Sequence, residues 1–387
     1  MGMAVYLDVA PDLLRWAVER AGWDEQTALQ RFPQLDDWTA GIRQPTLKQL
    51  EKFAHATHAP FGQLFLPEPP IEPLPVPDLR TFKDAAVRRP SADLLDTIYL
   101  CQERQDWYRD FAAENDLDPV EYIGSVSTVD APVTVAQRMH ALLGDAHSGQ
   151  HVAGSWSATF RRLVDGIEAS GALVMVSGIV GANTHRALDP QEFRGFALAD
   201  EIAPLVYVNG ADSKAAQIFA LIHEFAHLWL GGSALSDANV AERSVNSTER
   251  WCNDVAAEFL VPVDLLRVEY RGDASPESLD ELARRFSVST LVVLRRIADA
   301  GFLAWDDFRA RYIDEDRRVL AKLAEVREDG GGGNYYNTQP LRLSRQFARS
   351  VIESTHEGST RYRDAYQLLG MTKHSTFEGL AGQLGAR

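Results

Sequence analysis

The run from Ala215 to Leu230 constrains the fold most, because it is long, apolar and contains the pattern His-Glu-x-x-His. Asp212 and Ser213 are good helix caps, the run has neither Gly nor Pro, and Gly231 follows it, so we predict one helix. Apart from the two histidines and the glutamate, nearly every residue in it is apolar. We therefore expect the helix to be buried on most sides, with the rest of the chain organised around it.

The polar residues of this helix predict a metal site. His223 and His227 are four residues apart, so they share one helix face, and their imidazoles can bind one Zn²⁺ at ~2.0–2.1 Å. Glu224 lies about 100° around the helix, close enough to take a proton from a metal-bound water. The alternative is a chance match of three residues, but burying them without a partner would be costly, which favours zinc.

A downstream segment, Asn246 to Pro262, reads as a second helix that could supply a third protein ligand. Glu249 and Glu258 are nine residues apart and therefore lie on opposite faces, so only one can face the zinc. The Glu249 face is small and apolar apart from Asn253, whose amide could support a ligand histidine. The pattern favours Glu249 as the third ligand.

Two alternatives remain for this ligand. Asn246 followed three residues later by Glu249 resembles a capping box, in which Glu249 would bond the backbone and not the metal. The other candidate carboxylates are Glu258 and Glu242. A catalytic site needs only three protein ligands, with the fourth position left for water.

The two stretches together resemble the ImmA/IrrE family of bacterial metallopeptidases, the domain once called DUF955. The matching letters are His-Glu-Phe-Ala-His-Leu-Trp-Leu-Gly from His223 and Glu-x-x-Cys-Asn-x-x-Ala-Ala-Glu-Phe-Leu-x-Pro from Glu249. The resemblance implies that His223, His227 and Glu249 bind Zn²⁺ and that Glu224 is the catalytic base. It also implies cleavage of a specific partner, commonly a transcriptional repressor or antitoxin, in stress, prophage or mobile-element control.

Composition limits the remaining classes. The 387 residues suffice for two or three domains. No apolar run of ~18 residues and no signal peptide is seen, which argues against a membrane protein. With Cys101 and Cys252 as its two cysteines, the chain is expected in the reducing cytoplasm. A formal charge of −16 disfavours strong nonspecific binding to nucleic acid.

Residues 1–66 predict an all-helical N-terminal domain. Helices are expected at 12–21, 25–32, 35–40 and 46–58. The run from Leu35 to Ala54, with its tryptophan, glycine and Pro-Thr, resembles the Xre/Cro helix-turn-helix pattern.

That resemblance does not establish DNA binding. Asp36 and Asp37 lie on the helix that would enter the major groove and would face phosphates unfavourably. DNA binding and a protein-docking or dimerisation role are therefore both kept open. The residues expected to contact DNA or a partner are Trp38, Arg43 and Lys48.

Proline and glycine runs mark the other boundaries. Residues 67–79 form a proline-rich linker, and residues 80–329 contain a helical segment and the metallopeptidase domain. Residues 330–333 form a glycine linker. Residues 334–387 are a basic tail with seven Lys/Arg and four Asp/Glu, a net charge of +3, for which two amphipathic helices are expected.

Three short strands are expected near the zinc helix, at 172–177, 194–199 and 204–209. In zinc peptidases an edge strand beside the motif helix often holds extended substrate. The family resemblance implies that role for the last strand, with Val206, Tyr207 and Val208 as contacts, although the sequence alone does not say which strand is the edge. The predicted fold is α+β, mainly helical, with a small sheet packed against the zinc-motif helix and an N-terminal all-α helix-turn-helix domain.

These observations predict an intracellular zinc-dependent endopeptidase that cleaves a specific protein partner. The rival interpretation is a helix-turn-helix transcriptional regulator or toxin–antitoxin component whose zinc site is structural or inactive. Partners expected are the protein substrate, DNA through the N-terminal domain, and a second copy of the chain in a homodimer.

Overall fold

The structure is a computed structural model that describes residues 5–79, 90–144, 155–236, 246–327 and 335–386. Its described residues divide into two compact units. The first consists of residues 5–75 and 90–98, and the second of residues 76–79 and 99–386. Helix α5 (Ala92–Glu114) contributes its first residues to the first unit and the rest to the second.

The first unit is helical around one apolar core. Its elements are α1 (Pro11–Arg20), α2 (Glu25–Arg31), α3 (Leu35–Thr39), α4 (Leu47–Thr57) and the 3₁₀ helix η1 (Phe61–Phe65). Thr46 and Gln49 form a capping box that starts α4. Arg20 forms ion pairs with Glu72 at 3.1 Å and with Asp96 at 2.8 Å, which tie α1 to the chain that follows the helices.

The second unit contains a four-stranded mixed sheet in the order β1-β3-β2-β4. The strands are β1 (Leu173–Ser177), β2 (Gly195–Leu198), β3 (Leu205–Asn209) and β4 (Ala234–Ser236). Strand β1 is parallel to β3, whereas β2 is antiparallel to both β3 and β4. All residues of these strands are buried, so both faces of the sheet are covered.

The prediction that the strand at 204–209 lies at the edge of the sheet was wrong. Val206, Tyr207 and Val208 lie in β3, which pairs with β1 on one side and with β2 on the other. Its backbone groups are therefore used within the sheet and cannot add a substrate strand. The sequence predicted the strand but not its neighbours, because the pairing partners are distant in sequence. Strand β4 was not predicted, since three residues carry too little periodicity to be recognised.

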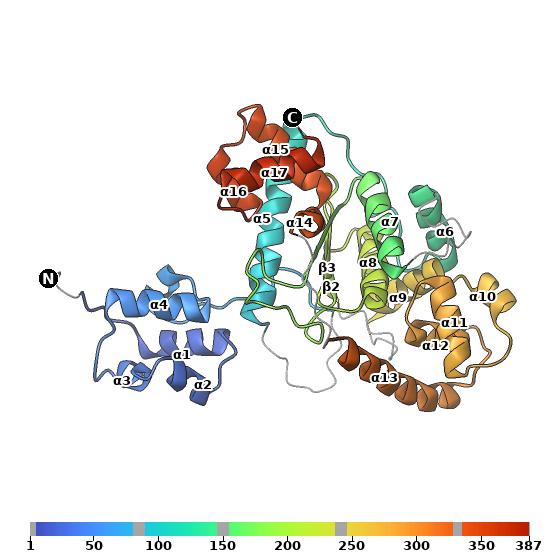
Figure 1. The fold of residues 1–387 in the computed structure, drawn as a ribbon, viewed down its shortest axis with the longest axis horizontal. Helices are drawn as coiled ribbons and strands as arrows, with labels where there is room; N and C mark the ends of the chain where they lie inside the picture. Colours follow the sequence, from blue (N-terminus) through green and yellow to red (C-terminus); the bar gives the residue numbers. More distant parts are fainter. Residues whose placement is uncertain (1–4, 80–89, 145–154, 237–245, 328–334, 387) are drawn as a thin grey trace. The chain divides into compact units, whose positions relative to one another are not determined.

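Helices cover both faces of the sheet (Figure 1). Helix α8 (Lys214–Leu230) packs on β2 and β3, and α7 (Trp156–Ala169) packs beside it on β1. Figure 1 shows α5 and α14 (Tyr335–Leu343) on the other side of the sheet. The remaining helices are α6 (Pro132–Leu143), α9 (Ser247–Leu260), α10 (Val263–Glu269), α11 (Pro276–Phe286), α12 (Thr290–Asp299), α13 (Trp305–Arg327), α15 (Arg345–His356), α16 (Tyr362–Leu368) and α17 (His374–Leu384). The mainly helical α+β fold of the prediction is confirmed.

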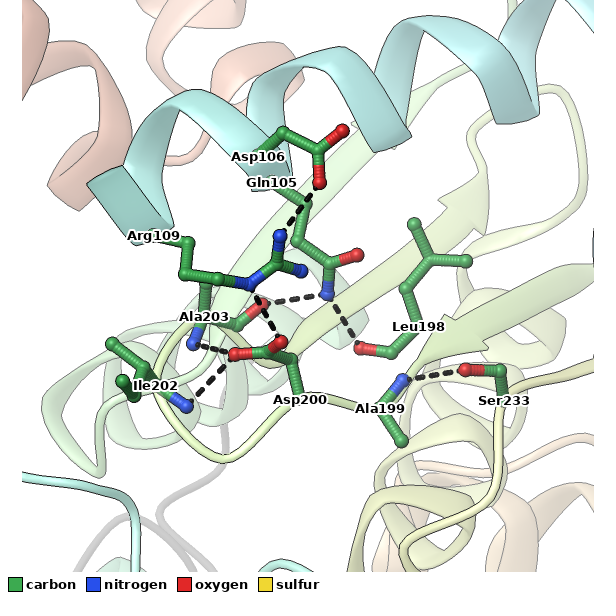
Figure 2. A network of polar contacts seen from close by, with 9 residues as sticks. All are labelled: Gln105, Asp106, Arg109, Leu198, Ala199, Asp200, Ile202, Ala203 and Ser233. Carbon is green, nitrogen blue, oxygen red and sulfur yellow. Dashed lines mark hydrogen bonds and ion pairs between the residues drawn. The ribbon is translucent and has the colours of Figure 1, made fainter. Parts of the chain in front are cut away.

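A polar network links α5 to the turn between β2 and β3 (Figure 2). The Gln105 side-chain amide donates to the carbonyls of Leu198 at 3.0 Å and Ala203 at 2.7 Å. Arg109 donates to the Asp200 carboxylate at 2.8 Å. Figure 2 also shows the backbone N–H of Ala199 donating to the Ser233 hydroxyl, at 2.9 Å. This last bond holds the residue that precedes β4 against the end of β2.

The C-terminal residues pack against the rest of the second unit. The described part of the segment expected as a basic tail forms four helices where two were predicted. Ser344, at φ 67°, separates α14 from α15, and α17 is a further helix that was not predicted. Helix α14 lies against β1, and Arg104 of α5 donates to the Leu368 carbonyl at 3.0 Å. The glycine linker expected at 330–333 lies outside the described residues. Within the described chain, no helix is both long enough and apolar enough to cross a bilayer.

Candidate metal centre

Helix α8 presents the His-Glu-x-x-His residues from inside the core. Ser213 caps its first turn by accepting from the Ala216 N–H at 3.2 Å, and Gly231 ends it in the left-handed region at φ 71°. A side chain at Gly231 would meet the Gly124 backbone at 2.8 Å, so glycine is needed there. His223 and Glu224 are 0% exposed and His227 is 1% exposed.

Helix α9 brings Glu249 to these histidines. The Asn246 side chain caps the helix by accepting from the Thr248 N–H at 2.9 Å and the Glu249 N–H at 3.4 Å. The Glu249 carboxylate extends to the imidazoles, with Oε1 at 3.0 Å from His227 Nε2 and Oε2 at 3.3 Å from His223 Nε2. Asn246 therefore supplies the cap while the Glu249 side chain faces the histidines.

The three side chains form a buried His–His–Glu cluster with the spacing that a tetrahedral ion needs. Four ligands at ~2.0–2.1 Å from zinc lie about 3.3–3.4 Å from one another. The separation of His223 Nε2 from His227 Nε2 is 3.2 Å, and the two distances to Glu249 are 3.0 and 3.3 Å. The buried Oε2 of Glu249 faces His223 Nε2, and one metal ion between the three side chains would bind both atoms. The donor set fits Zn²⁺.

The ionisation states also suit a metal. Burial lowers the pKa of His227, although its hydrogen bond to Glu249 opposes that shift. Burial disfavours the charged form of Glu249, but the attraction of His223 and the hydrogen bonds to both imidazoles outweigh it and lower its pKa to about 2. The cluster thus holds a neutral His227 and an ionised Glu249 near neutral pH, the forms that ligate metal ions.

Glu224 is packed against strand β2 next to this cluster. A Cβ at Gly195 would lie 2.8 Å from Glu224 Cγ and 3.0 Å from its Oε1. Glycine at this strand position therefore leaves the volume that the Glu224 side chain occupies. Gly195 was not predicted as a site residue, although an isolated glycine in a strand is a known sign of close approach.

Ser236, the last residue of β4, is a further member of the cluster that the sequence analysis missed. Its Oγ is 3.3 Å from His227 Nε2, 3.3 Å from Glu249 Oε1 and 3.5 Å from Glu224 Oε2, and the residue is 0% exposed. Nothing in the sequence pointed to it, because serine is common and β4 is too short to be predicted.

The alternative carboxylates lie elsewhere or cannot be placed. Glu258 is on the opposite face of α9, where it forms an ion pair with Arg296 of α12. Glu242 lies outside the described residues. The Asn253 Oδ1 is buried without a hydrogen-bond partner in the described part of the chain, so the support expected from Asn253 for a ligand histidine is not seen.

The contact residues expected in the N-terminal unit divide into two kinds. Arg43 and Lys48 are exposed. Trp38 is 3% exposed and packs against Phe32 and Phe53 in the core of that unit, so its assignment as a contact residue was wrong. The sequence pattern alone does not show whether a tryptophan on an amphipathic helix is a core residue or a surface contact residue. Only its packing in the structure distinguishes these roles.

Comparison with known families gives two matches. Residues 168–298 match the IrrE N-terminal-like domain, a peptidase family, and residues 343–383 match a domain of unknown function, DUF8813. The first match contains His223, Glu224, His227 and Glu249, and it supports a metallopeptidase of the IrrE/ImmA type. No curated protein matches the chain.

Proposed function

We propose that this protein is an intracellular zinc-dependent endopeptidase. The observation that carries the proposal is the buried convergence of His223, His227 and Glu249 at the spacing of tetrahedral ligands, with Glu224 beside them. A zinc ion held by these three side chains would supply Lewis acidity toward the scissile carbonyl and would acidify a water. The two buried free cysteines are compatible with a reducing cytoplasm.

Glu224 is the proton carrier in this proposal. Its carboxylate would take a proton from the attacking water and deliver it to the leaving amine as the peptide bond breaks. Packing against Gly195 restricts the Glu224 side chain, so the base is held in place before substrate arrives. The substrate proposed from the family resemblance is one protein partner, a transcriptional repressor or antitoxin, in stress, prophage or mobile-element regulation.

The rival function is a DNA-binding regulator or toxin–antitoxin component with a structural or inactive zinc site. One observation favours it: the Ser236 hydroxyl oxygen is a fourth possible donor beside the two imidazoles and the carboxylate, and four-donor zinc sites are commonly structural. The N-terminal unit could also offer Arg43 and Lys48 to DNA. The test is a mobility shift. Tight, sequence-specific binding at physiological salt, unchanged by Glu224→Gln, would support the regulator, whereas weak binding lost steeply with salt would support docking.

The test of the peptidase is metal content together with cleavage. We expect about one zinc per chain, lost in His223→Ala and in His227→Ala but retained in Glu224→Gln. The protein should be incubated with the small DNA-binding protein encoded by a neighbouring gene, and cleavage should disappear in Glu224→Gln. Full zinc in both histidine variants would contradict the site, and cleavage by Glu224→Gln would contradict the role of the base.

A further inference from the structure

Resting on the proposed function, we propose that Ser236 closes the fourth coordination position and that β4 keeps the peptidase latent until this strand moves. The Ser236 Oγ lies 3.3 Å from both His227 Nε2 and Glu249 Oε1. These separations equal those among the three protein ligands themselves, which are 3.0 to 3.3 Å. The hydroxyl therefore lies at ligand spacing from two of the three proposed ligand atoms, on the side of the cluster where a fourth ligand would bind.

This position is the one that catalysis needs open. Catalytic zinc sites use three protein ligands and leave the fourth to water or substrate, whereas structural sites are filled by protein donors. Ser236 Oγ is also 3.5 Å from Glu224 Oε2, between the proposed base and the proposed ligands. An attacking water between Glu224 and the metal would thus compete with this hydroxyl for the same space.

Strand β4 is held in place from both sides. Its inner side pairs with β2, where Ser236 lies opposite Gly195 and Leu235 lies opposite Phe196. On its outer side, the Leu79 N–H donates to the Leu235 carbonyl at 3.0 Å, and the Leu235 N–H donates to the Pro77 carbonyl at 3.0 Å. The segment 77–79 therefore lies beside β4, with one isolated parallel bridge between Asp78 and Leu235.

The same segment also covers the sheet edge nearest the cluster. Extended peptides commonly bind zinc peptidases by adding to such an edge through main-chain hydrogen bonds. Here both polar backbone groups of Leu235 on the outer side are already paired with residues 77–79. A substrate strand could bind at this edge only by displacing the chain's own segment. Strand β4 and segment 77–79 together thus close both the fourth coordination position and the sheet edge at which a substrate strand would bind.

The experiment uses the full chain loaded with Co²⁺ in place of zinc, with acetohydroxamate as a probe that needs an open position. Ser236→Ala removes the hydroxyl while keeping the strand. We expect Ser236→Ala to change the visible spectrum of the bound cobalt and to bind acetohydroxamate about tenfold more tightly than the unmodified protein. Ser177→Ala is the matched control, because Ser177 is also a buried strand serine, but it bonds the Ile179 carbonyl.

A second variant tests the strand without altering the cluster. Leu79→Pro removes the N–H that donates to the Leu235 carbonyl. The preceding residue, Asp78, pairs with β4, and an extended backbone before a proline is favourable. Leu79→Pro should also strengthen acetohydroxamate binding and should accelerate cleavage of the protein partner. Ile71→Pro is its control, since Ile71 is 93% exposed in the same proline-rich stretch.

The outcomes separate the two proposals. If no variant and no unmodified protein binds cobalt, the proposed metallopeptidase fails, and this inference fails with it. If cobalt binds but acetohydroxamate binds the unmodified protein and Ser236→Ala equally well, the metal site stands and the closing role of Ser236 is wrong. If only Leu79→Pro leaves binding unchanged, segment 77–79 does not hold the strand closed.

Discussion

Two glutamates in the second unit lie beside helix N-termini, and yet their pKa values are shifted in opposite directions. Glu249 is in the first turn of α9, where His223 and His227 outweigh burial and lower its pKa to about 2. Glu168 of α7 meets the start of α15, where it accepts from the Ser344 hydroxyl and from the Arg345 N–H at 2.9 Å. Burial outweighs these two bonds and raises the pKa of Glu168 to about 7.

The comparison shows that a helix N-terminus alone does not decide the charge of a carboxylate. Both carboxylates lie near the N-terminus of a helix, whose dipole favours negative charge, and Glu168 also accepts from a backbone N–H. The metal cluster adds two imidazoles that carry positive charge when protonated, or a cation when metal is bound, whereas the α7–α15 contact adds mainly neutral donors. The first carboxylate is suited to binding a metal, and the second is suited to holding a proton near neutral pH.

The largest effect is expected at the metal cluster. Glu249→Ala should weaken zinc binding by more than about 100-fold, because loss of a direct ligand should exceed the loss of a supporting residue. Glu258→Gln is the matched control from the same helix, since Glu258 pairs with Arg296 on the opposite face. The zinc content of both variants is to be measured. If Glu249→Ala kept zinc and Glu258→Gln lost it, Glu249 would not be the third ligand.

The next effect concerns packing around the proposed base. Gly195→Ala would place a Cβ 2.8 Å from both Glu224 Cγ and the Tyr207 carbonyl oxygen. We expect a loss of about 1–3 kcal/mol in the free energy of unfolding and a large loss of cleavage, with zinc retained. Gly232→Ala is the control for thermal unfolding and activity, because a Cβ there would meet no heavy atom within 4 Å beyond its neighbours in the chain. Equal behaviour of the two variants would show that β2 does not restrain Glu224.

The α7–α15 contact should respond to pH. Because folding raises the pKa of Glu168 from 4.5 to about 7, its contribution to stability is full below pH 4.5 and is lost as pH rises through about 7. Glu168→Gln keeps an acceptor but does not titrate. It should match the unmodified protein at pH 4 and exceed it by on the order of 1–3 kcal/mol at pH 8. Urea unfolding at both pH values measures this, and an equal difference at each would contradict the shift.

The smallest effect is expected from the cap of α9. Asn246→Ala removes the acceptor of the Thr248 and Glu249 N–H groups and should cost about 0.5–2 kcal/mol in the free energy of unfolding. Because the Glu249 side chain faces the histidines and does not cap the helix, zinc should remain bound. Calorimetry with metal analysis tests both statements. Loss of zinc with little loss of stability would mean that the cap is needed to place Glu249.

Residues close together in sequence were predicted well, and residues brought together by pairing were not. The zinc-motif helix was expected at residues 215–230 and is observed at Lys214–Leu230. The helical angle showed that only one of Glu249 and Glu258 can face the zinc, and the small apolar face around Glu249 decided the preference. Of the two, the structure places Glu249 beside the histidines. Strand β3 was expected at 204–209, within one residue of its bounds, but its interior place in the sheet was missed.

The sequence by itself determined the properties that helix geometry controls locally: which residues share a face, where a cap begins a helix, and where glycine ends it. Only the tertiary structure decided what lies beside those faces. Ser236 reaches the cluster through pairing of β4 with β2, and Glu168 meets Ser344 from a position 176 residues away. Such contacts depend on burial and strand pairing across long loops, and no periodicity in a single segment encodes its partner.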